Sequence, residues 1–352
     1  MKRLYTKYIV LLVCFIALLL PATAYSQEAI KGTVTIPQYQ NDTILFRSML
    51  LSTAYHQEDM PQAGVVNGKF SLPFTPTYPH MYRVGWKSEW DNVISRSVPL
   101  FIDSSTTTIT IDDAYSPNGI NGKTAEEYVK KFIPFVIPEG VHLNEFIHSQ
   151  SAALDDKLNK YITLNPDSYV ALWFLVIQFN ENGYLPIYET MLKNFSKKIK
   201  TGQLWKALNG EFSLIQIKMN RPFPQLVLKN LDLEQEKMIV PKSEYTLIEI
   251  WWSRCKPCLE EMPHWQKLYS NYKNKGFNVI AISADKTTFI DNWKKRINER
   301  GFVWKNYLDE NAVFLNSEKI YSLPTNFLLD KNETVIRKNI SHEEMKQLLD
   351  AK

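Results

Sequence analysis

The feature that most constrains the fold is a pair of cysteines, Cys255 and Cys258, that separates a short apolar run from an amphipathic segment. The run Leu247–Trp252 is almost continuously apolar, which is typical of a strand buried on both faces of a sheet. The segment after the cysteines places its apolar residues on one helical stripe and ends at Gly276, a residue suited to terminating a helix. A buried strand that leads directly into a helix predicts an α/β layer structure for this part of the chain.

Strands and helices continue to alternate after this first pair of elements. The pattern predicts a strand over 277–283, a helix over 289–300, a hairpin made of 326–329 and 334–338, and a final helix. Ser341 and Glu344 have the spacing of a capping box in front of that last helix. Pro222 and Pro224 mark the boundary before the whole unit, so we expect an α/β domain over residues 223–352.

The amino-terminal part of the chain has a pattern of short strands. Polar and apolar residues alternate in the segments 32–36, 69–72 and 108–111. Asn67–Gly68 lies between two such runs and suits a tight hairpin turn. We therefore expect an antiparallel β-sandwich over residues 27–115.

Residues 116–222 have a helical pattern instead. Thr124–Glu127 predicts a capping box, and Asn165–Ser168 precedes a long apolar stretch that suits a buried helix. Four lysines gather near the end of this region, at positions 193, 197, 198 and 200. They are either a basic docking patch or the solvated face of a helix, and a solvated face is the more common case.

The first residues of the chain, 1–26, have the pattern of a secretory signal peptide. A basic start precedes the apolar run Tyr8–Leu20, and small residues follow before possible cleavage after Ala24 or Ser26. The run is shorter than the roughly 20 residues that a membrane span needs. An uncleaved anchor is the alternative, but we expect an exported protein of the periplasm or cell envelope.

The overall composition excludes two classes of protein. Apolar residues make up 45% of the chain and charged residues 22%, which is ordinary globular usage and argues against wholesale disorder. Loss of the three cations within residues 1–26 lowers the formal net charge from +4 to +1. A nearly neutral chain lacks the electrostatic footprint of a nucleic-acid binder, so we expect no nucleic-acid partner.

The sequence has three cysteines, and Cys14 lies within the expected signal peptide. The remaining pair would close too small a loop to stabilise much, which points to chemistry. At a strand-to-helix junction, the sulfur of Cys255 lies at a helix N-terminus, where unpaired N–H groups and the helix dipole stabilise a thiolate. Cys258, one turn further, is shielded and close enough to attack a mixed disulfide. In thiol–disulfide exchange, Cys255 is thus the candidate nucleophile and Cys258 the candidate resolving thiol.

Two other interpretations of the cysteine pair are open at this point. A structural zinc site would need two further ligands, and only His264 is near in sequence, so we expect no metal. An inert pair of buried thiols is disfavoured because Arg254 and Lys256 flank the first cysteine and imply exposure.

Glu249 is the one acid within the apolar run before the cysteines. A carboxylate is costly in a central strand unless it has a partner or a role. Strand alternation can place it beneath the end of the sheet, near Cys258, where burial would raise its pKa and fit it to exchange a proton with that thiol. The alternative is a strand nearer the sheet edge, with Glu249 facing water.

The segment Trp251–Cys258, followed by Glu261–Pro263, resembles the active-site region of thioredoxin-fold domains of the TlpA/ResA type, a family of exported thiol–disulfide oxidoreductases. Ile280–Asp285 resembles the family's next strand, and Leu323–Thr325 its cis-proline loop. Arg254 departs from the pattern, because many relatives have Trp there. The resemblance covers residues 223–352, and the β region is similar to a domain of unknown function fused ahead of such domains in Bacteroidetes-type secreted proteins.

The resemblance implies roles for residues around the cysteine pair. Pro324 is expected in the cis form, which leaves the neighbouring backbone free to pair with a substrate strand, whereas an isolated loop proline would usually be trans. The expected substrate-binding residues are Trp252, Lys256, Pro257, Leu323 and Thr325, and Glu261 has a supporting role. Glu249 matches the buried acid of thioredoxins.

The resemblance also implies the kind of reaction and its partners. We expect an enzyme without a cofactor, whose Cys255–Cys258 disulfide is redox-active, and whose clients are disulfide-bearing proteins such as apocytochromes in cytochrome c biogenesis. A membrane thiol carrier would supply its electrons. Two alternatives remain: a partner-binding module with incidental cysteines, and a peroxide-reducing relative, whose usual threonine-proline context before the cysteine is absent.

Overall fold

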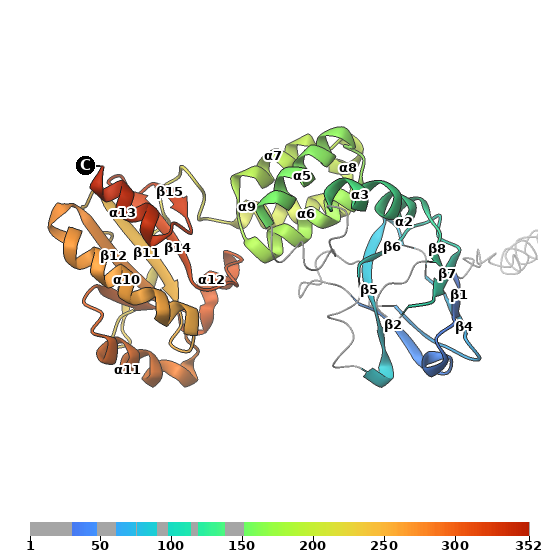
Figure 1. Ribbon diagram of the computed structural model, residues 1–352, viewed down its shortest axis with the longest axis horizontal. Coiled ribbons are helices and arrows are strands. Elements are labelled where there is room, and N and C mark those ends of the chain that lie inside the picture. Colours follow the sequence, from blue (N-terminus) through green and yellow to red (C-terminus); the bar gives the residue numbers. More distant parts are fainter. Residues whose placement is uncertain are drawn as a thin grey trace, which may run out of the picture.

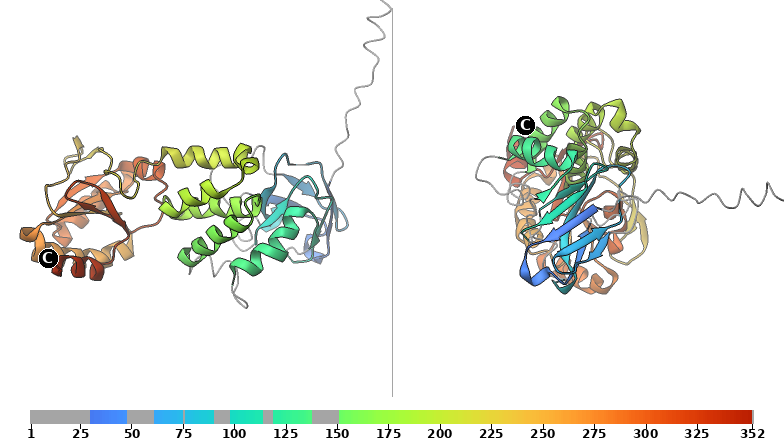
Figure 2. Two further views of the ribbon diagram at one scale, coloured as in Figure 1. Left: turned by 90° about the horizontal axis from the view of Figure 1, so that it is seen from above. Right: turned by 90° about the vertical axis from the view of Figure 1, so that its right-hand side faces the viewer.

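The computed structural model describes residues 30–47, 61–74, 76–89, 98–113, 119–137 and 151–351. The signal-peptide prediction for residues 1–26 therefore lies outside the described residues. A β-rich part, a group of helices and the carboxy-terminal part follow one another along the long axis of the molecule (Figures 1 and 2). The group of helices lies between the other two.

The β-rich part contains two four-stranded sheets. The first has the strand order β4(Lys69–Leu72)-β1(Ile30–Val34)-β7(Thr108–Ile111)-β8(Gly119–Ile120), and the second has the order β3(Gln62–Gly64)-β2(Thr43–Arg47)-β5(His80–Trp86)-β6(Leu100–Ile102). Side chains from both sheets share one hydrophobic core, which includes Phe46, Phe70 and Trp86. Short 3₁₀ turns cover Pro37–Tyr39 and Lys87–Glu89.

The expectation of an all-antiparallel sandwich is wrong at one pairing, because β1 and β7 run parallel. The chain between them is long and builds all four strands of the second sheet, so β7 returns beside β1 in the same direction, as a parallel pair with a long crossover allows. The hairpin turn is confirmed: Asn67 and Gly68 both have positive φ, and Val66 and Lys69 exchange two backbone hydrogen bonds. Strand β8 falls within the segment expected to be helical.

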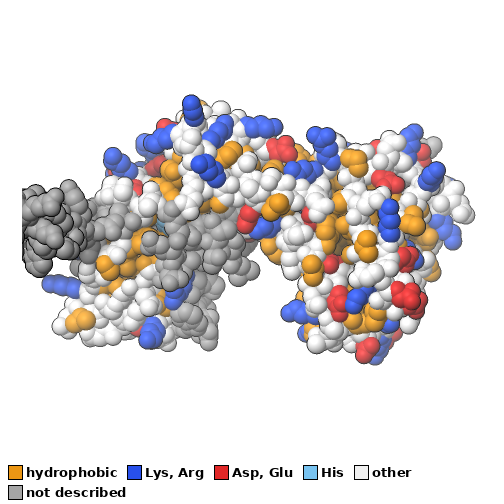
Figure 3. Space-filling view, turned by 180° about the vertical axis from the view of Figure 1, so that it is seen from behind, with side chains coloured by type: hydrophobic (Ala, Val, Ile, Leu, Met, Phe, Trp, Pro, Cys, Tyr) orange, Lys and Arg blue, Asp and Glu red, His pale blue; other side chains and the backbone are white. Residues whose placement is uncertain are grey.

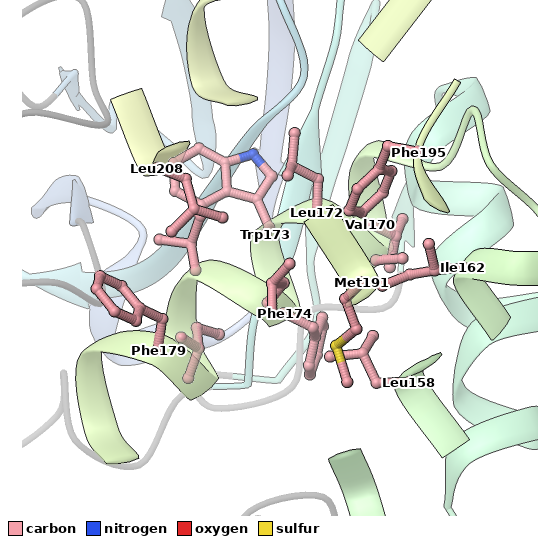
Figure 4. Close-up of a cluster of buried hydrophobic side chains, with 14 of the residues drawn as sticks. Leu158, Ile162, Val170, Leu172, Trp173, Phe174, Phe179, Met191, Phe195 and Leu208 are labelled. Carbon is pink, nitrogen blue, oxygen red and sulfur yellow. The ribbon is translucent and has the colours of Figure 1, made fainter. Parts of the chain in front are cut away.

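The helices of the middle part are α2(Lys123–Glu127), a π-helical turn over Tyr128–Phe132, α3(Ile133–Val136), α5(Ser151–Leu164), α6(Tyr169–Asn182), α7(Pro186–Asn194), α8(Lys197–Thr201) and α9(Gln203–Leu214). Helix α6 is buried along most of its length, and the surrounding helices pack around its side chains, as Figure 4 shows for Trp173, Phe174 and Phe179. Ser168 caps α6 by accepting a hydrogen bond from the Ala171 N–H.

The capping box expected at Thr124–Glu127 does not form. Gly122 is the N-cap of α2 and supplies no side-chain bond, while Asp103 Oδ2, from the β-rich part, accepts the Thr124 N–H at 2.7 Å. A distant carboxylate thus takes the place of a local cap. Lys and Arg side chains gather along the edge of the helical part in Figure 3. Of the four clustered lysines, Lys193, Lys197 and Lys198 are exposed.

The carboxy-terminal part is built on a seven-stranded sheet. Its strand order is β10(Gln235–Lys237)-β9(Val227–Lys229)-β13(Lys305–Leu308)-β12(Phe277–Ser283)-β11(Tyr245–Trp251)-β14(Thr325–Asp330)-β15(Val335–Lys338). Strands β11, β12 and β13 are parallel, whereas β14, β15 and β9 pair antiparallel with their neighbours. The predicted central strand, the next strand and the final hairpin are confirmed.

Helices cover both faces of this sheet. Helices α10(Lys256–Tyr272), α11(Ile290–Arg300) and α13(His342–Asp350) share one hydrophobic cluster with Leu247 and Trp251 of β11. The opposite face, with Ile248 and Ile250, packs against α12(Val313–Ser317) and the segment that leads into the domain. The remaining 3₁₀ turns are Lys273–Lys275, Thr287–Phe289 and Glu310–Ala312. The capping box at Ser341 is confirmed.

The segment that contains α12 also contacts the helical part. The Glu318 carboxylate accepts backbone N–H bonds from Gln216 and Ile217, the latter at 2.8 Å. Lys319 pairs with Glu211 of α9 at 2.9 Å. The residues that follow α12 therefore hold the end of α9 and the connection between the two parts.

A second lysine strengthens this contact from β15. Lys338 Nζ donates to the Asn182 carbonyl at the C-terminus of α6, at 2.6 Å, where a cation is favoured by the helix dipole. Burial lowers the pKa of Lys338 to about 8. A cavity of about 240 Å³ lies between the two parts, and its walls include Asp155, Ser322 and Thr325.

Candidate active site

The cysteine pair lies where the sequence places it, between β11 and α10. Cys255 is the N-cap of α10, and the structure holds Cys255 and Cys258 as a disulfide. The Cys258 N–H points at Cys255 Sγ, 3.1 Å away. Cys255 is half-buried, whereas Cys258 is fully buried. The Cys255 sulfur can thus be reached from solvent and lies at the helix N-terminus, whereas the Cys258 sulfur is shielded.

Glu249 is fully buried in the middle of β11, between Ala281 of β12 and Asn326 of β14. Leu247 and Trp251, on the same face of the strand, belong to the cluster that contains Cys258, so Glu249 faces α10. Neither carboxylate oxygen has a hydrogen-bond partner among the described residues. The strand is central, and the edge-strand alternative for Glu249 is therefore wrong.

The environment of Glu249 disfavours its charged form. Burial raises the pKa of Glu249 well above its usual range, and the negative charge of Glu261 raises this pKa further, while the nearby Asn326 amide opposes the change. Glu261 lies one helical turn after Cys258 on α10. Glu261, Glu249 and Cys258 therefore lie on the side of the sheet that α10 covers, and Cys258 follows the end of β11.

The proline loop borders the same end of the sheet. The Leu323–Pro324 peptide bond is cis, and Thr325 pairs with Ile250 near the end of β11 that leads into Cys255. Leu323 and Cys255 pack against the same hydrophobic cluster. Thr325 is buried, and its hydroxyl donates to the Ser322 carbonyl at 2.7 Å. The structure thus places the proline loop beside the end of β11 that leads into the cysteine pair.

The other predicted site residues surround the disulfide at different depths. Lys256 and Pro257 are exposed in the first turn of α10, and Lys256 forms a long ion pair of 3.8 Å with Glu260. Trp252 is half-buried. Arg254, the position that departs from the family pattern, places its guanidinium 4.4 Å from the ring centroid of Phe289.

A buried network that holds the loop before Cys255 was not predicted from the sequence. The Asp285 carboxylate accepts hydrogen bonds from the Ser253 N–H at 2.8 Å and the Ser253 hydroxyl at 2.7 Å, and it also accepts from Ser283. Asp285 is 2% exposed, so these bonds replace its lost hydration. The sequence signal that could have indicated this network is an acid, Asp285, two residues after Ser283 at the end of a buried strand.

Two features of the described residues bear on other classes of protein. In the parts of the chain that the structure describes, no group of three or more metal-ligating side chains is close enough together to hold an ion. Across the same residues, no helix combines the length and the apolar character needed to cross a bilayer.

Known proteins match part of this chain. A family model described as Redoxin matches residues 218–351. The thiol-disulfide oxidoreductases ResA of Bacillus thuringiensis (strain Al Hakam) and Bacillus anthracis are each 29% identical over 133 residues, which is 38% of this chain and 76% of the relative.

Solved structures also resemble part of this chain. The thioredoxin domain of a thiol-disulfide oxidoreductase from Bacteroides vulgatus is 24% identical, with a TM-score of 0.35, and the match covers 39% of this chain and 98% of that domain. A thioredoxin-like protein from Bacteroides caccae is 17% identical, with a TM-score of 0.43, over 56% of this chain and 76% of the other.

The family match, the ResA relatives and the disulfide at the strand–helix junction define the chain as a thioredoxin-like thiol–disulfide oxidoreductase. Enzymes of this kind act through a disulfide, need no cofactor, and use disulfide-bearing substrates. Its carboxy-terminal domain is of the TlpA/ResA-like thioredoxin-fold type, which confirms the resemblance inferred from the sequence.

Proposed function

We propose that the protein is exported and reduces disulfides of envelope proteins through a Cys255–Cys258 couple. The observation that carries this proposal is the asymmetry of the pair, with a half-buried Cys255 at the N-terminus of α10 and a fully buried Cys258 behind it. The match to relatives named thiol-disulfide oxidoreductase ResA supports disulfide exchange, and the pattern of residues 1–26 supports export. Clients such as apocytochromes and a membrane thiol carrier as electron donor are part of the proposal.

The proposed reaction has two exchange steps. The Cys255 thiolate attacks one sulfur of the client disulfide, which forms a mixed disulfide and releases the other client sulfur as a thiolate. The Cys258 thiolate then attacks Cys255 Sγ, which forms the Cys255–Cys258 disulfide and releases the second client thiol. The protein loses two electrons and the client gains two.

Neighbouring residues have distinct roles in these steps. Glu249 accepts the proton from Cys258, because its raised pKa lies closer to that of a thiol than an ordinary carboxyl's. The loop at Leu323, Pro324 and Thr325 binds the client backbone, together with Trp252 and the first turn of α10. Asp285 is a positioning residue, because it acts on the chemistry only through Ser253.

The reduction potential of the Cys255–Cys258 couple tests the direction of electron flow. We expect a value more negative than about −200 mV. A couple with such a low potential favours its disulfide form, so its dithiol form passes electrons to the client. Equilibration against a glutathione or dithiothreitol series, followed by thiol trapping, measures it. A value near that of a strong oxidant, about −120 mV, would show that the protein oxidises its clients.

Brief alkylation of the reduced protein tests which cysteine is the nucleophile. Below neutral pH, we expect iodoacetamide to label Cys255 preferentially, because the helix N-terminus favours its thiolate and Cys258 is shielded. Peptide mass mapping gives the ratio of the two labels, and the urea-unfolded protein, where both thiols are exposed, is the control. Preferential label on Cys258 in the folded protein contradicts the assignment.

A further inference from the structure

A groove beside the disulfide extends from the first turn of α10 to residues of α11 that have no role in the proposed exchange steps. Its volume is about 600 Å³, and it lies between the start of α10 and one side of α11. Its wall includes Ser253 and Arg254 from the loop before Cys255 and Lys256 just after it. A client held on Cys255 by a mixed disulfide therefore has this groove next to its own cysteine.

Positive charge dominates the groove. Four cations line it, two beside Cys255 and two on α11: Arg254, Lys256, Arg296 and Arg300. Glu260 is the one acid among the lining residues.

The ion pairs in the groove neutralise only part of this charge. Lys256 and Glu260 are 3.8 Å apart and largely exposed, which makes a weak pair. Arg296 pairs with Glu299 at 3.1 Å. Arg300 forms no ion pair with another described residue, and Arg254 lies on the Phe289 ring. The groove thus keeps a net positive charge.

The groove also has an apolar wall. Leu259 is half-buried and Pro263 is exposed, and both line the groove between the cations of the two helices. A surface with apolar contacts framed by cations is complementary to a peptide that carries an apolar residue beside acidic ones.

We propose that this cationic groove is a client-binding subsite that favours disulfides flanked by acidic residues. The proposal rests on the proposed function, because the client must reach the groove through exchange at Cys255. Carboxylates near the client cysteine would pair with the arginines of α11 and steer the encounter, and salt would screen this attraction over about 8 Å at physiological ionic strength.

Three peptides that differ only in the residues around one disulfide test the proposal. Their flanks are Asp-Leu-Glu, Asn-Leu-Gln and Lys-Leu-Lys, and the measured quantity is kcat/KM for their reduction at 20 mM and 500 mM NaCl. We expect the acidic peptide to exceed the neutral one by about tenfold at low salt, as for two or three exposed charge pairs, and the ratio to approach one at high salt. The basic peptide should be the slowest.

Matched variants on α11 locate the effect. Arg300→Glu reverses a charge in the groove, and Lys294→Glu makes the same change in net charge at a position outside the groove. We expect the acidic-to-neutral ratio to fall to about one or below in Arg300→Glu and to persist in Lys294→Glu. Circular dichroism of both variants checks their folding.

The outcomes separate the two proposals. Equal reduction of all three peptides by the unaltered protein overturns the groove and leaves the exchange function intact. An acidic preference that Lys294→Glu lowers as much as Arg300→Glu shows a general charge effect and also overturns the groove. If no peptide is reduced, the proposed function fails and the subsite fails with it.

Discussion

Cys255→Ser is expected to abolish disulfide exchange, whereas Cys258→Ser is expected to stop it halfway. Serine at position 255 has no thiolate to attack the client, so the rate should fall to that of the uncatalysed reaction. Without the buried thiol of Cys258, the first exchange still forms a mixed disulfide, which then accumulates because the internal resolving attack is lost. The two variants therefore differ in kind, although both stop turnover.

Mass spectrometry after incubation with a disulfide peptide measures this difference. Cys258→Ser should carry the mass of one client chain, which dithiothreitol removes, and Cys255→Ser should carry none. The double variant is the control for non-specific attachment. If clients had the same redox state with Cys255→Ser as with the unaltered protein, and partner binding stayed intact, the cysteines would be incidental to a binding module.

Glu249→Gln is the second change with a large expected effect. Glutamine has nearly the same shape but accepts no proton, so the resolving step loses its proton acceptor and should slow by about 10²-fold near neutral pH. At high pH, Cys258 ionises without help and the difference should shrink. Rates of client reduction from pH 6 to about 9.5 span the ordinary thiol pKa of roughly 8.5.

Glu261→Gln is the matched control for this pH profile. It removes the neighbouring charge that raises the pKa of Glu249 but leaves the buried carboxyl in place. We expect the rate of client reduction by Glu261→Gln to depend on pH in the same way as that of the unaltered protein, except that the rate begins to rise at a lower pH. Superimposable profiles of Glu249→Gln and the unaltered protein would remove the proton-acceptor role.

Glu249→Gln should also change how the free energy of unfolding depends on pH. Between the unfolded pKa of about 4.3 and the raised folded pKa, the folded protein binds more protons at Glu249 than the unfolded chain does. The free energy of unfolding therefore falls as pH rises through this window, by at most about 1.4 kcal/mol per pH unit. In Glu249→Gln, this contribution is absent. Urea unfolding at pH 4.5, 6 and 7.5 should show the variant gaining relative stability with pH.

Much of the candidate site could be predicted because its determinants are local. A buried strand that leads into a helix is predicted by three features that lie close together in the sequence: the apolar run, the spacing of the two cysteines and the position of Glu249. The structure agrees. Leu323–Pro324 has no such local signal. Its cis form was expected only through the resemblance to a known family.

The features that sequence analysis missed depend on distant partners. Asp103 and Thr124 are far apart in the chain, so the carboxylate that replaces the expected cap of α2 could not be recognised from the local pattern. Asp285 lies just after the next strand, β12, and likewise supports Ser253 from a distant part of the chain. The direction of β7 relative to β1 depends on the whole intervening sheet.

The contacts of Glu318, Lys319 and Lys338 limit how freely this thioredoxin-fold domain could be exchanged during evolution. Each of these charges is matched to a backbone group or a carboxylate on the helical part. A copy of the domain joined to a different neighbour would keep the charges and lose their partners, which is most costly for the buried Glu318. Recombination that moves the domain alone is therefore disfavoured, and the two parts should be inherited as one unit.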